Sequence, residues 1–254
     1  ANSAGSGHRG GFAEISGKRL LGFAGKVSLR GSSRGMSGTL LLDPTDITID
    51  DNATNDGSFD GGDPDTFTGT AATANVDIAD LNAALAVANV VITTASAEAG
   101  TGNITWNTAT GIDDGGAGNS ITLIADNDII FTDINFDAWT GDFTAQAVND
   151  ITVTSMTFGT WSGAFLAEAD NNININGAMN RAGASGDITL IADHDTGGAG
   201  VLTISQAINT AGGDLDLEGH QIQVSAALDA ANVIATAAAG GMLIAAAGDI
   251  TSTG

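Results

Sequence analysis

Apolar residues recur at a fixed spacing of 22 positions through the middle of the chain. The positions that share this spacing are Ile121, Phe143 and Phe165, then Ile129, Ile151 and Ile173, with Ala125, Ala147 and Ala169 between them. Within each unit apolar and polar residues alternate, which is typical of a β-strand that buries one face. A constant period of this length indicates a repeat architecture, so it constrains the fold more than any other feature.

The repeat predicts an all-β fold, a right-handed parallel β-helix with about 20–22 residues per coil. The gaps between strands leave no room for the crossover helices of a doubly wound sheet. An antiparallel sandwich does not require matching residues at matching positions, whereas coils stacked about 4.8 Å apart do. We expect one solenoid domain over residues 1–254, with about ten to twelve coils and a length of about 45–60 Å.

Two irregular steps interrupt the repeat near the C-terminus. The phrase Leu202–Asn209 follows Ile173–Asn180 at a step of 29, and the step from Leu202 to Ile222 is 20. The longer step indicates an insertion around His194–Gly200. The last residues, Gly248–Gly254, repeat an earlier phrase, and we expect them to open a further coil without completing it.

Composition and pattern divide the chain into four segments. Residues 1–45 are predicted to form basic N-terminal coils, 46–76 an acidic loop, 77–94 a helix plus a strand, and 95–254 the regular coils. Apolar residues at helical spacing from Ile78 onward, with Asp77 as the N-cap, predict a short amphipathic helix near residues 78–88 that lies over the solenoid.

Two further sets of side chains follow the 22-residue step and are expected to stack along the solenoid axis. They are the asparagines Asn127, Asn149 and Asn171, and the aromatic pairs Phe136 and Phe158, Trp139 and Trp161, and Phe143 and Phe165. Asparagines at a coil corner can hydrogen-bond along the axis, and they tolerate the left-handed backbone of a tight corner. Offset aromatic pairs contribute on the order of 1 kcal/mol each beyond their burial.

Charge is unevenly distributed in this acidic chain, whose formal net charge is −23. Six of the seven Lys and Arg residues lie in the first 34 positions, and the seventh is Arg181. The acidic body excludes nucleic-acid binding by a broad basic face, because that binding needs Lys and Arg to neutralise phosphates. The lack of cysteine in the sequence excludes disulfides and thiolate metal sites, and no apolar run is long enough for membrane insertion.

An aspartate-rich segment is the candidate cation site. Hard oxygen donors on a loop with glycines suit Ca²⁺, although neither the EF-hand spacing nor the calcium-binding nonapeptide is matched. The candidate calcium ligands are Asp51, Asn55, Asp56, Asp60 and Asp63. The alternative interpretation is a solvated acidic loop.

No residue is predicted to be catalytic, although two groups were candidates. The triplet around His194, with Asp193 and Asp195, could hold a metal or catalyse, but a solvated insertion loop explains it better. Asp128 and Asp150 lie one coil apart, at a separation that suits glycoside hydrolysis, yet a corner ladder supplies such pairs by repetition. A lyase acting on acidic sugars would need cationic groups or a metal, and Arg181 is the single basic residue of the body.

Trp139 and Trp161 have two interpretations. If both are exposed, a flat aromatic pair can stack on the sugar rings of a glycan. We favour the other interpretation, in which they cover a coil corner.

Several phrases in the N-terminal third are not explained by the coil repeat. They are Gly10–Lys18, Gly25–Val27 and Gly38–Ile49, followed by the helix phrase at 77–88 and by Gly102–Trp106. Together they resemble large filamentous-haemagglutinin-type proteins, over most of residues 10–130. The resemblance implies a right-handed parallel β-helix exported by a two-partner route, secreted or on the cell surface of a Gram-negative bacterium or a cyanobacterium. Members of that family serve in adhesion, biofilms or surface fibres.

We therefore expect a non-enzymatic extracellular structural or adhesive β-solenoid. Solenoid ends are open sheet edges, so subunits could stack head-to-tail into a surface fibre, with the basic N-terminal end against an acidic body. The residues assigned to this self-association are Lys18, Arg19, Lys26, Arg30 and Arg34. The alternatives are continuation into a longer parent protein, a glycan-binding adhesin fragment, and a β-helix polysaccharide-degrading enzyme.

Overall fold

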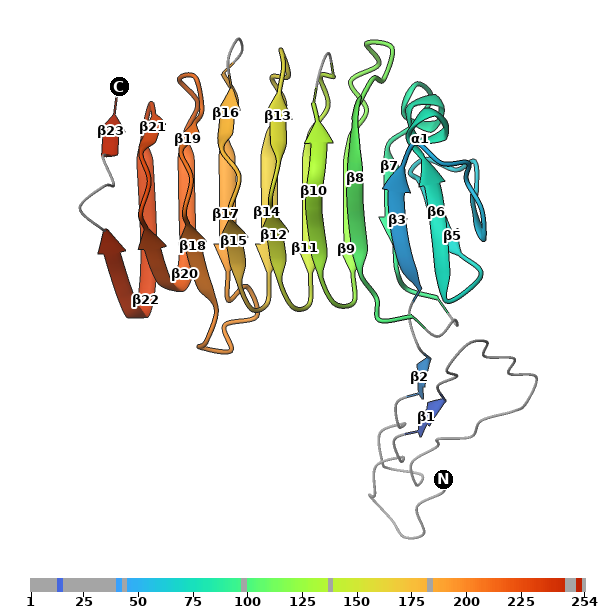
Figure 1. Cartoon of the computed structure of the whole chain (residues 1–254), viewed down its shortest axis with the longest axis horizontal. Coiled ribbons are helices and arrows are strands. Elements are labelled where there is room, and N and C mark those ends of the chain that lie inside the picture. Colours follow the sequence, from blue (N-terminus) through green and yellow to red (C-terminus); the bar gives the residue numbers. More distant parts are fainter. Residues whose placement is uncertain are drawn as a thin grey trace, which may run out of the picture.

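The computed structural model describes residues 13–15, 40–42, 45–96, 100–136, 139–181, 185–244 and 250–252. The described chain forms a parallel β-solenoid of about eight turns, and its helical content is 4%. Figure 1 shows the turns side by side, from β6 and α1 at one end to β22 and β23 at the other. The predicted all-β solenoid is confirmed, and the described residues account for about eight of the ten to twelve coils expected over the whole chain.

The strands stack in three columns, which form the three faces of the solenoid. The first face contains β5 (Asp65–Gly69), β7 (Val90–Thr93), β9 (Ile121–Ala125), β11 (Phe143–Ala147), β14 (Phe165–Ala169), β17 (Ile188–Ala192) and the first parts of β20 (Leu215–Val224) and β22 (Val233–Ile244). The second face contains β6 (Thr73–Asp77), β3 (Asp46–Asp50), β8 (Ile104–Gly111), β10 (Ile129–Asn135), β12 (Ile151–Val153), β15 (Ile173–Ile175), β18 (Val201–Ile204) and the second parts of β20 and β22.

The third face begins with the ends of β8 and β10. It continues with β13 (Met156–Phe158), β16 (Met179–Arg181), β19 (Ile208–Asn209), β21 (Leu228–Ala230) and β23 (Ile250–Ser252). Two further strands, β1 (Ala13–Ile15) and β2 (Leu40–Leu42), pair with each other in a separate parallel sheet. The rest of the segment predicted as basic coils, 1–45, lies almost entirely outside the described residues.

The 22-residue step sets the strand register. Phe143 pairs with Ile121 on one side and with Phe165 on the other, so matching apolar residues stack on the inside of the first face. The same alternation buries every second residue of each regular strand, and these residues form one continuous core along the stack. The predicted insertion also holds: Ile173 pairs with Leu202, 29 residues later, and residues 193–200 form the connection between β17 and β18.

The segment 46–76, predicted as an acidic loop, is instead mostly sheet. It contains β3, β5, β6 and the short strand β4 (Gly57–Phe59), which pairs antiparallel with β5. The aspartates of this segment belong to the strands: Asp46 and Asp50 flank the inward-facing Ile47 and Ile49 in β3, and Asp65 is itself buried in β5. β3 lies between β6 and β8, so the chain first forms β3 and then turns back to build the end of the stack.

The predicted helix is present as α1 (Ile78–Leu85), and the Asp77 side chain accepts a hydrogen bond from the Ala79 N–H at its N-terminus. It ends three residues before the predicted boundary, at Leu85. The prediction for the last residues is wrong in one respect. β23 pairs with β21 on the third face, so residues 250–252 continue the turn begun by β22 and do not open another.

Candidate functional site

A ladder of amide and carboxylate side chains occupies the corner between the first and second faces. Asn171 donates to the Asn149 side-chain oxygen at 3.2 Å, and Asn127 donates to Asn103 at 2.8 Å. Aspartates join the same ladder: Asp128 accepts from the Asn149 amide at 2.7 Å, and Asp150 accepts from the Asn171 amide at 2.9 Å. The predicted side-chain bond at the 22-residue step is therefore present between Asn171 and Asn149, whereas the Asn149 amide donates to Asp128 in place of Asn127.

One of the two expected reasons for asparagine at this corner, a left-handed backbone, does not apply. Among the described residues, the non-glycine positions with positive φ are Asp56, Asp193, Thr196 and Ala211, and no ladder asparagine is among them. The side-chain hydrogen bonds, and not a left-handed backbone, account for the repeated asparagine. Left-handed backbone at this corner occurs at Gly102, whose carbonyl oxygen accepts from the Asn127 N–H, and at Asp193, whose N–H donates to the Asn171 carbonyl oxygen.

The candidate glycosidase pair, Asp128 and Asp150, belongs to this ladder. Asp128 accepts from the Asp150 N–H at 3.1 Å, in addition to the Asn149 amide. Asp150 accepts from the Asn172 N–H and from its side-chain amide, both at 3.0 Å. Each carboxylate thus holds the next coil at its corner.

The aromatic ladder lies inside the core. Its stacked pairs are Trp139 and Trp161 at 5.4 Å, Phe143 and Phe165 at 5.7 Å, and Phe136 and Phe158 at 5.3 Å between ring centroids, with interplanar angles of 12° or less. Both tryptophans are 0% exposed, and their indole N–H groups donate to the carbonyl oxygens of Asn119 and Gly141. A sugar-stacking platform at Trp139 and Trp161 is therefore excluded, and the interpretation as a covered corner is correct.

Arg181 ends the aromatic ladder, a role that sequence reasoning missed. Its guanidinium lies 4.4 Å from the Trp161 ring and 5.0 Å from the Phe158 ring, and it donates to the Gly163 carbonyl oxygen at 2.9 Å. The side chain is 2% exposed. Burial lowers the pKa of Arg181 to about 10, against the opposing effect of Asp187, so it stays protonated at neutral pH. A cation over aromatic faces, rather than a surface charge, explains the one arginine of the body.

The predicted calcium ligands do not come together. Among the described residues, which include all five, no three acidic or histidine side chains are placed to hold a metal ion. Two of the carboxylates hold distant segments instead: Asp51 accepts from the Thr108 hydroxyl at 2.8 Å, and Asp63 accepts from the Asn89 amide at 3.2 Å. The residues predicted as calcium ligands, Asp51, Asn55, Asp56, Asp60 and Asp63, therefore do not form one cluster of carboxylates.

Two carboxylates of this region have lowered pKa values. Partial burial acts to raise the pKa of Asp50, but hydrogen bonds from the Asn52 N–H and from the side-chain amides of Asn75 and Asn52 outweigh it. The backbone N–H groups of Gly62 and Thr66 lower the pKa of Asp60. Both aspartates therefore act as charged acceptors that fix turns.

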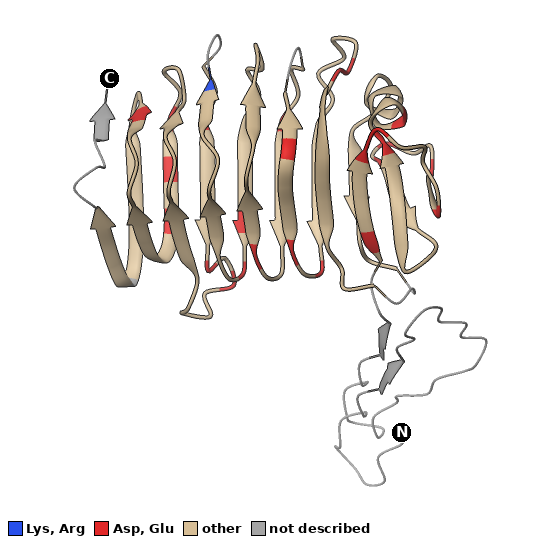
Figure 2. Ribbon diagram, in the orientation of Figure 1, with Lys and Arg blue, Asp and Glu red and all other residues tan. Residues whose placement is uncertain are grey.

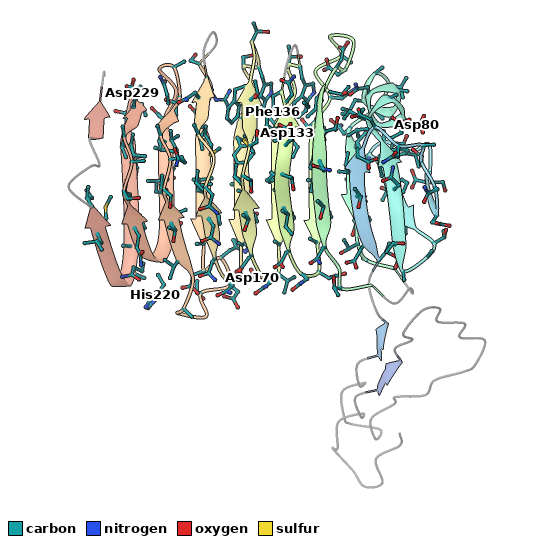
Figure 3. The ribbon with its side chains drawn as sticks, in the orientation of Figure 1. Asp80, Asp133, Phe136, Asp170, His220 and Asp229 are labelled. Carbon is teal, nitrogen blue, oxygen red and sulfur yellow. The ribbon has the colours of Figure 1, made fainter. Side chains whose placement is uncertain are left out.

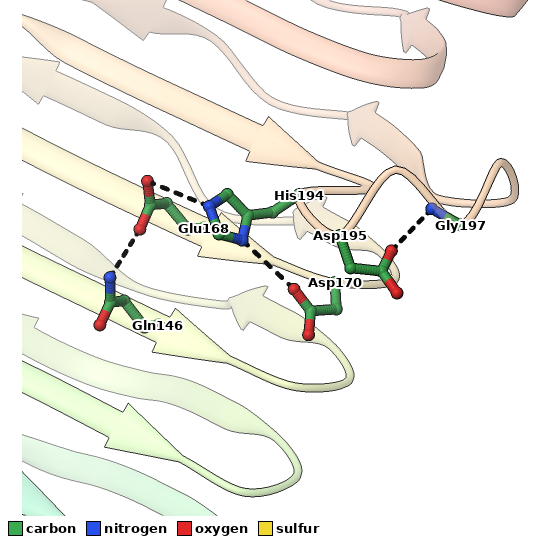
Figure 4. A network of polar contacts seen from close by, with 6 residues as sticks. All are labelled: Gln146, Glu168, Asp170, His194, Asp195 and Gly197. Atoms are coloured by element: carbon green, nitrogen blue, oxygen red, sulfur yellow. Dashed lines mark hydrogen bonds and ion pairs between the residues drawn. The ribbon is translucent and has the colours of Figure 1, made fainter.

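Figure 4 shows the polar network around His194, where the insertion meets the body. His194 Nδ1 lies 3.3 Å from Asp170, and Nε2 lies 3.8 Å from Glu168, which also accepts from Gln146 at 2.7 Å. The neighbouring Asp193 and Asp195 do not contribute to this network. They accept from backbone N–H groups of residues 197–199 and so brace the insertion itself.

The His194 network borders a shallow groove of about 220 Å³. Its lining residues are Ile124, Ala125, Gln146, Ala147, Val148, Glu168, Asp170 and His194. In Figure 3, Asp170 and His220 lie along the same lower corner of the stack. This groove combines apolar and hydrogen-bonding side chains on an accessible surface, which sequence reasoning did not single out because its residues come from successive coils.

At the end of the stack that contains β5 and β6, the outer strand edges are covered; we call this the closed end. β4 pairs antiparallel with the outer edge of β5. The N–H and carbonyl groups of Asn55 pair with those of Asn75 on the outer edge of β6, at 3.1 Å in each direction. On the third face, α1 buries Ile78, Leu81, Ala84 and Leu85 against the core.

At the other end, which we call the open end, β22 pairs with β20 and has no second strand partner among the described residues. Met242 and Ile244 face inward but are 39% and 44% exposed, whereas Ile222 and Val224, directly beneath them in β20, are 0% and 2% exposed. No described segment therefore covers the inward side chains of β22. Figure 2 shows that β22 carries no charged residue.

Lys18, Arg19, Lys26, Arg30 and Arg34, predicted to mediate self-association, lie outside the described residues. The closed end nevertheless bears on the head-to-tail model. Since the outer edges of β5 and β6 already have partners, another subunit could pair there only by displacing them.

The fold defines the chain as a β-solenoid protein. Comparisons with protein-family models, with curated proteins and with solved structures find no match. In the described part of the chain, no helix has the length and apolar character needed to cross a membrane.

Proposed function

We propose that this chain is a non-enzymatic, extracellular structural module whose stiff stacked body positions its surfaces and its two ends. One observation carries the proposal: the side chains that could otherwise catalyse a reaction or bind a ligand are used to hold one coil to the next. Asp128, Asp150 and the ladder asparagines bond along the axis, and Trp139, Trp161 and Arg181 fill the core. Such a body suits a protein whose role depends on its length and its stiffness.

The resemblance to filamentous-haemagglutinin-type proteins supports an extracellular, adhesive setting. The solenoid agrees with the fold that the resemblance implies, and α1 lies where the family-like helix phrase at 77–88 occurs. A cysteine-free acidic chain is compatible with this setting, because it needs no oxidative folding and stays soluble through its charge.

A second candidate function is glycan binding, and the His194 groove is the observation that favours it. Apolar side chains of Ile124 and Val148 lie beside hydrogen-bonding groups of Gln146 and His194, which is the mixture that a sugar surface requires. This site replaces the tryptophan pair as the place where a glycan adhesin activity would reside.

Two assays on the full chain test the function. Small-angle scattering should give an elongated particle, and incubation with neutral and acidic polysaccharides should release no new reducing ends. Release of reducing ends that is lost in Asp150→Asn would contradict the structural role and favour a hydrolase. Binding on a glycan array that is lost in Gln146→Ala, with Gln223→Ala as the control, would favour the adhesin instead.

A further inference from the structure

The His194 groove lies between two rows of outward-facing side chains at the edge of the first face. The first row consists of residues paired across β9, β11 and β14, namely Ile124, Gln146 and Glu168. The second row consists of residues whose backbone N–H donates to an alanine carbonyl oxygen of the preceding coil, namely Val148, Asp170 and His194. Between the rows the groove is lined by the small side chains of Ala125 and Ala147. Because the alanines are short, the larger side chains of the two rows form its walls.

One coil places a carboxylate in each row. Glu168 and Asp170 are separated by one residue and lie on the same outward side of the chain at the end of β14. Their side chains are 15% and 31% exposed, so they are recessed in the wall but still accessible. Among the described strands of the first face, no other has acidic residues in both rows.

The groups that face these carboxylates leave a negative charge in the groove. Figure 4 shows Gln146 and His194 directed at them from the two neighbouring coils. His194 is the one titratable base in the lining of the groove, and it lies between Glu168 and Asp170. Arg181, the one Lys or Arg of the described chain, is buried among aromatic rings. The groove therefore repels acidic ligands and attracts cationic ones.

The hydrogen-bonding chemistry narrows the ligand further. Ionised carboxylates only accept hydrogen bonds, whereas an ammonium group donates three and accepts none. Hydrogen bonds between an ammonium and a carboxylate are about twice as strong as those between neutral groups. An ammonium group is therefore the ligand group that best suits Glu168 and Asp170.

The apolar part of the groove indicates what carries the ammonium. Ile124 and Val148 are 38% and 57% exposed, and both line the groove. A ligand that covers them removes apolar surface from water. The ring of an amino sugar combines an apolar face of C–H groups with an amino group on its rim, so one ligand can use both parts of the groove.

We propose that the His194 groove binds amino sugars that carry a free amino group, with the ammonium at Glu168 and Asp170 and the sugar ring against Ile124 and Val148. The inference rests on the second candidate function, glycan binding, and adds the chemical class of the glycan. Sugars with a carboxylate or sulfate are disfavoured by charge. Sugars with an acetylated amino group lack the ammonium.

Calorimetric titration of the full chain tests the ligand class. The two probes are a trisaccharide of glucosamine and the same trisaccharide of N-acetylglucosamine, each at about pH 7 and about 0.15 M salt. They differ only in whether the amino groups are free. The glucosamine trisaccharide should bind at least about tenfold more tightly.

Substitutions that each remove one negative charge test the position. Glu168→Gln and Asp170→Asn should each weaken binding of the glucosamine trisaccharide by about tenfold. Asp216→Asn is the matched control, because Asp216 lies on β20, two coils and about 10 Å from β14. Salt screens charges at that separation, so the control should change the affinity by less than about twofold.

The failures of this proposal and of glycan binding are distinguishable. Tighter binding of the N-acetylated trisaccharide, lost in Gln146→Ala, would overturn the amino-sugar proposal and leave glycan binding in place. No binding of either trisaccharide would overturn both. An equal loss in Asp216→Asn, or equal affinity for spermidine, would show general attraction to an acidic surface and would also overturn the proposal.

Discussion

The two ends of the solenoid differ in how far they depart from the repeat. The closed end abandons the 22-residue step and uses a short antiparallel strand, a bridging asparagine and α1 to cover its edges. The open end keeps the parallel pairing of the regular coils through β22 and β23. The comparison teaches that irregular sequence covers the strand edges of this stack, while regular sequence continues the parallel pairing without covering them.

The largest expected difference between the ends comes from a buried aromatic residue. Phe67 is fully buried in β5 and packs edge-to-face on Phe59 of β4 at 5.3 Å. Phe67→Ala should lower the free energy of unfolding by about 3–5 kcal/mol, since it removes a core ring and leaves a cavity. Ile234→Ala, at an exposed site on β22, should change it by about 0.5 kcal/mol or less. Denaturant unfolding of the two variants compares the ends, and equal losses would contradict the assignment.

A smaller loss is expected from crowding the hairpin that covers β5. A Cβ at Gly57 would collide with the Phe67 ring and lie 2.9 Å from the Thr68 carbonyl oxygen. Gly57→Ala should therefore destabilise the chain by about 1–3 kcal/mol. Thr236→Ala on the open end is the control and should be close to neutral. Denaturant unfolding measures both variants. If both have the same free energy of unfolding as the wild type, β4 does not contribute to closing the stack.

The helix N-cap should contribute about 1 kcal/mol. Asp77→Ala removes the acceptor for the Ala79 N–H, and α1 should fray from its first turn. Asp80→Ala removes an acid from the same turn without breaking a cap, so we expect a loss of about 0.3 kcal/mol. Thermal unfolding of the two variants distinguishes the capping hydrogen bond from the effect of a negative charge alone. Equal shifts in Tm would argue against a contribution from the capping hydrogen bond.

The smallest expected effect is the change in stability with pH that comes from the Asp50 carboxylate. Because hydrogen bonds lower the folded-state pKa of Asp50, its carboxylate stabilises the chain above its ordinary pKa, and this contribution is lost as pH falls through the folded value. Asp50→Asn should therefore be less stable than the wild type at pH 6, and the gap should narrow below about pH 4. Calorimetry at both pH values measures it. A gap that does not depend on pH would mean that the charge is not what holds Asn52 and Asn75.

The regular coils could be predicted because residues that recur at a fixed spacing in the sequence are the residues that pair on neighbouring strands. Residues at the 22-residue step, such as Phe143 and Phe165, pair as expected, and the insertion near His194 lengthens one step without changing the column. The helix could also be predicted, since its cap and apolar spacing are local signals.

The ends and the candidate sites could not be predicted in the same way. The position of β3 between β6 and β8 depends on chain order, which a residue pattern does not report. The aspartates of 46–76 resemble cation ligands in sequence but are separated by the strands they flank. The 22-residue spacing does not say whether the Trp139 side chain points into the core or toward solvent. The groove beside His194 is formed by residues from successive coils.

Hydrogen exchange of the full chain, measured peptide by peptide, tests the contrast between the ends most directly. We predict that residues 65–77 are strongly protected, because both edges of their strands are paired or covered. Residues 233–244 should exchange more readily, because one edge of β22 has no strand partner among the described residues. Protection of 233–244 that equals that of 65–77 would contradict the account.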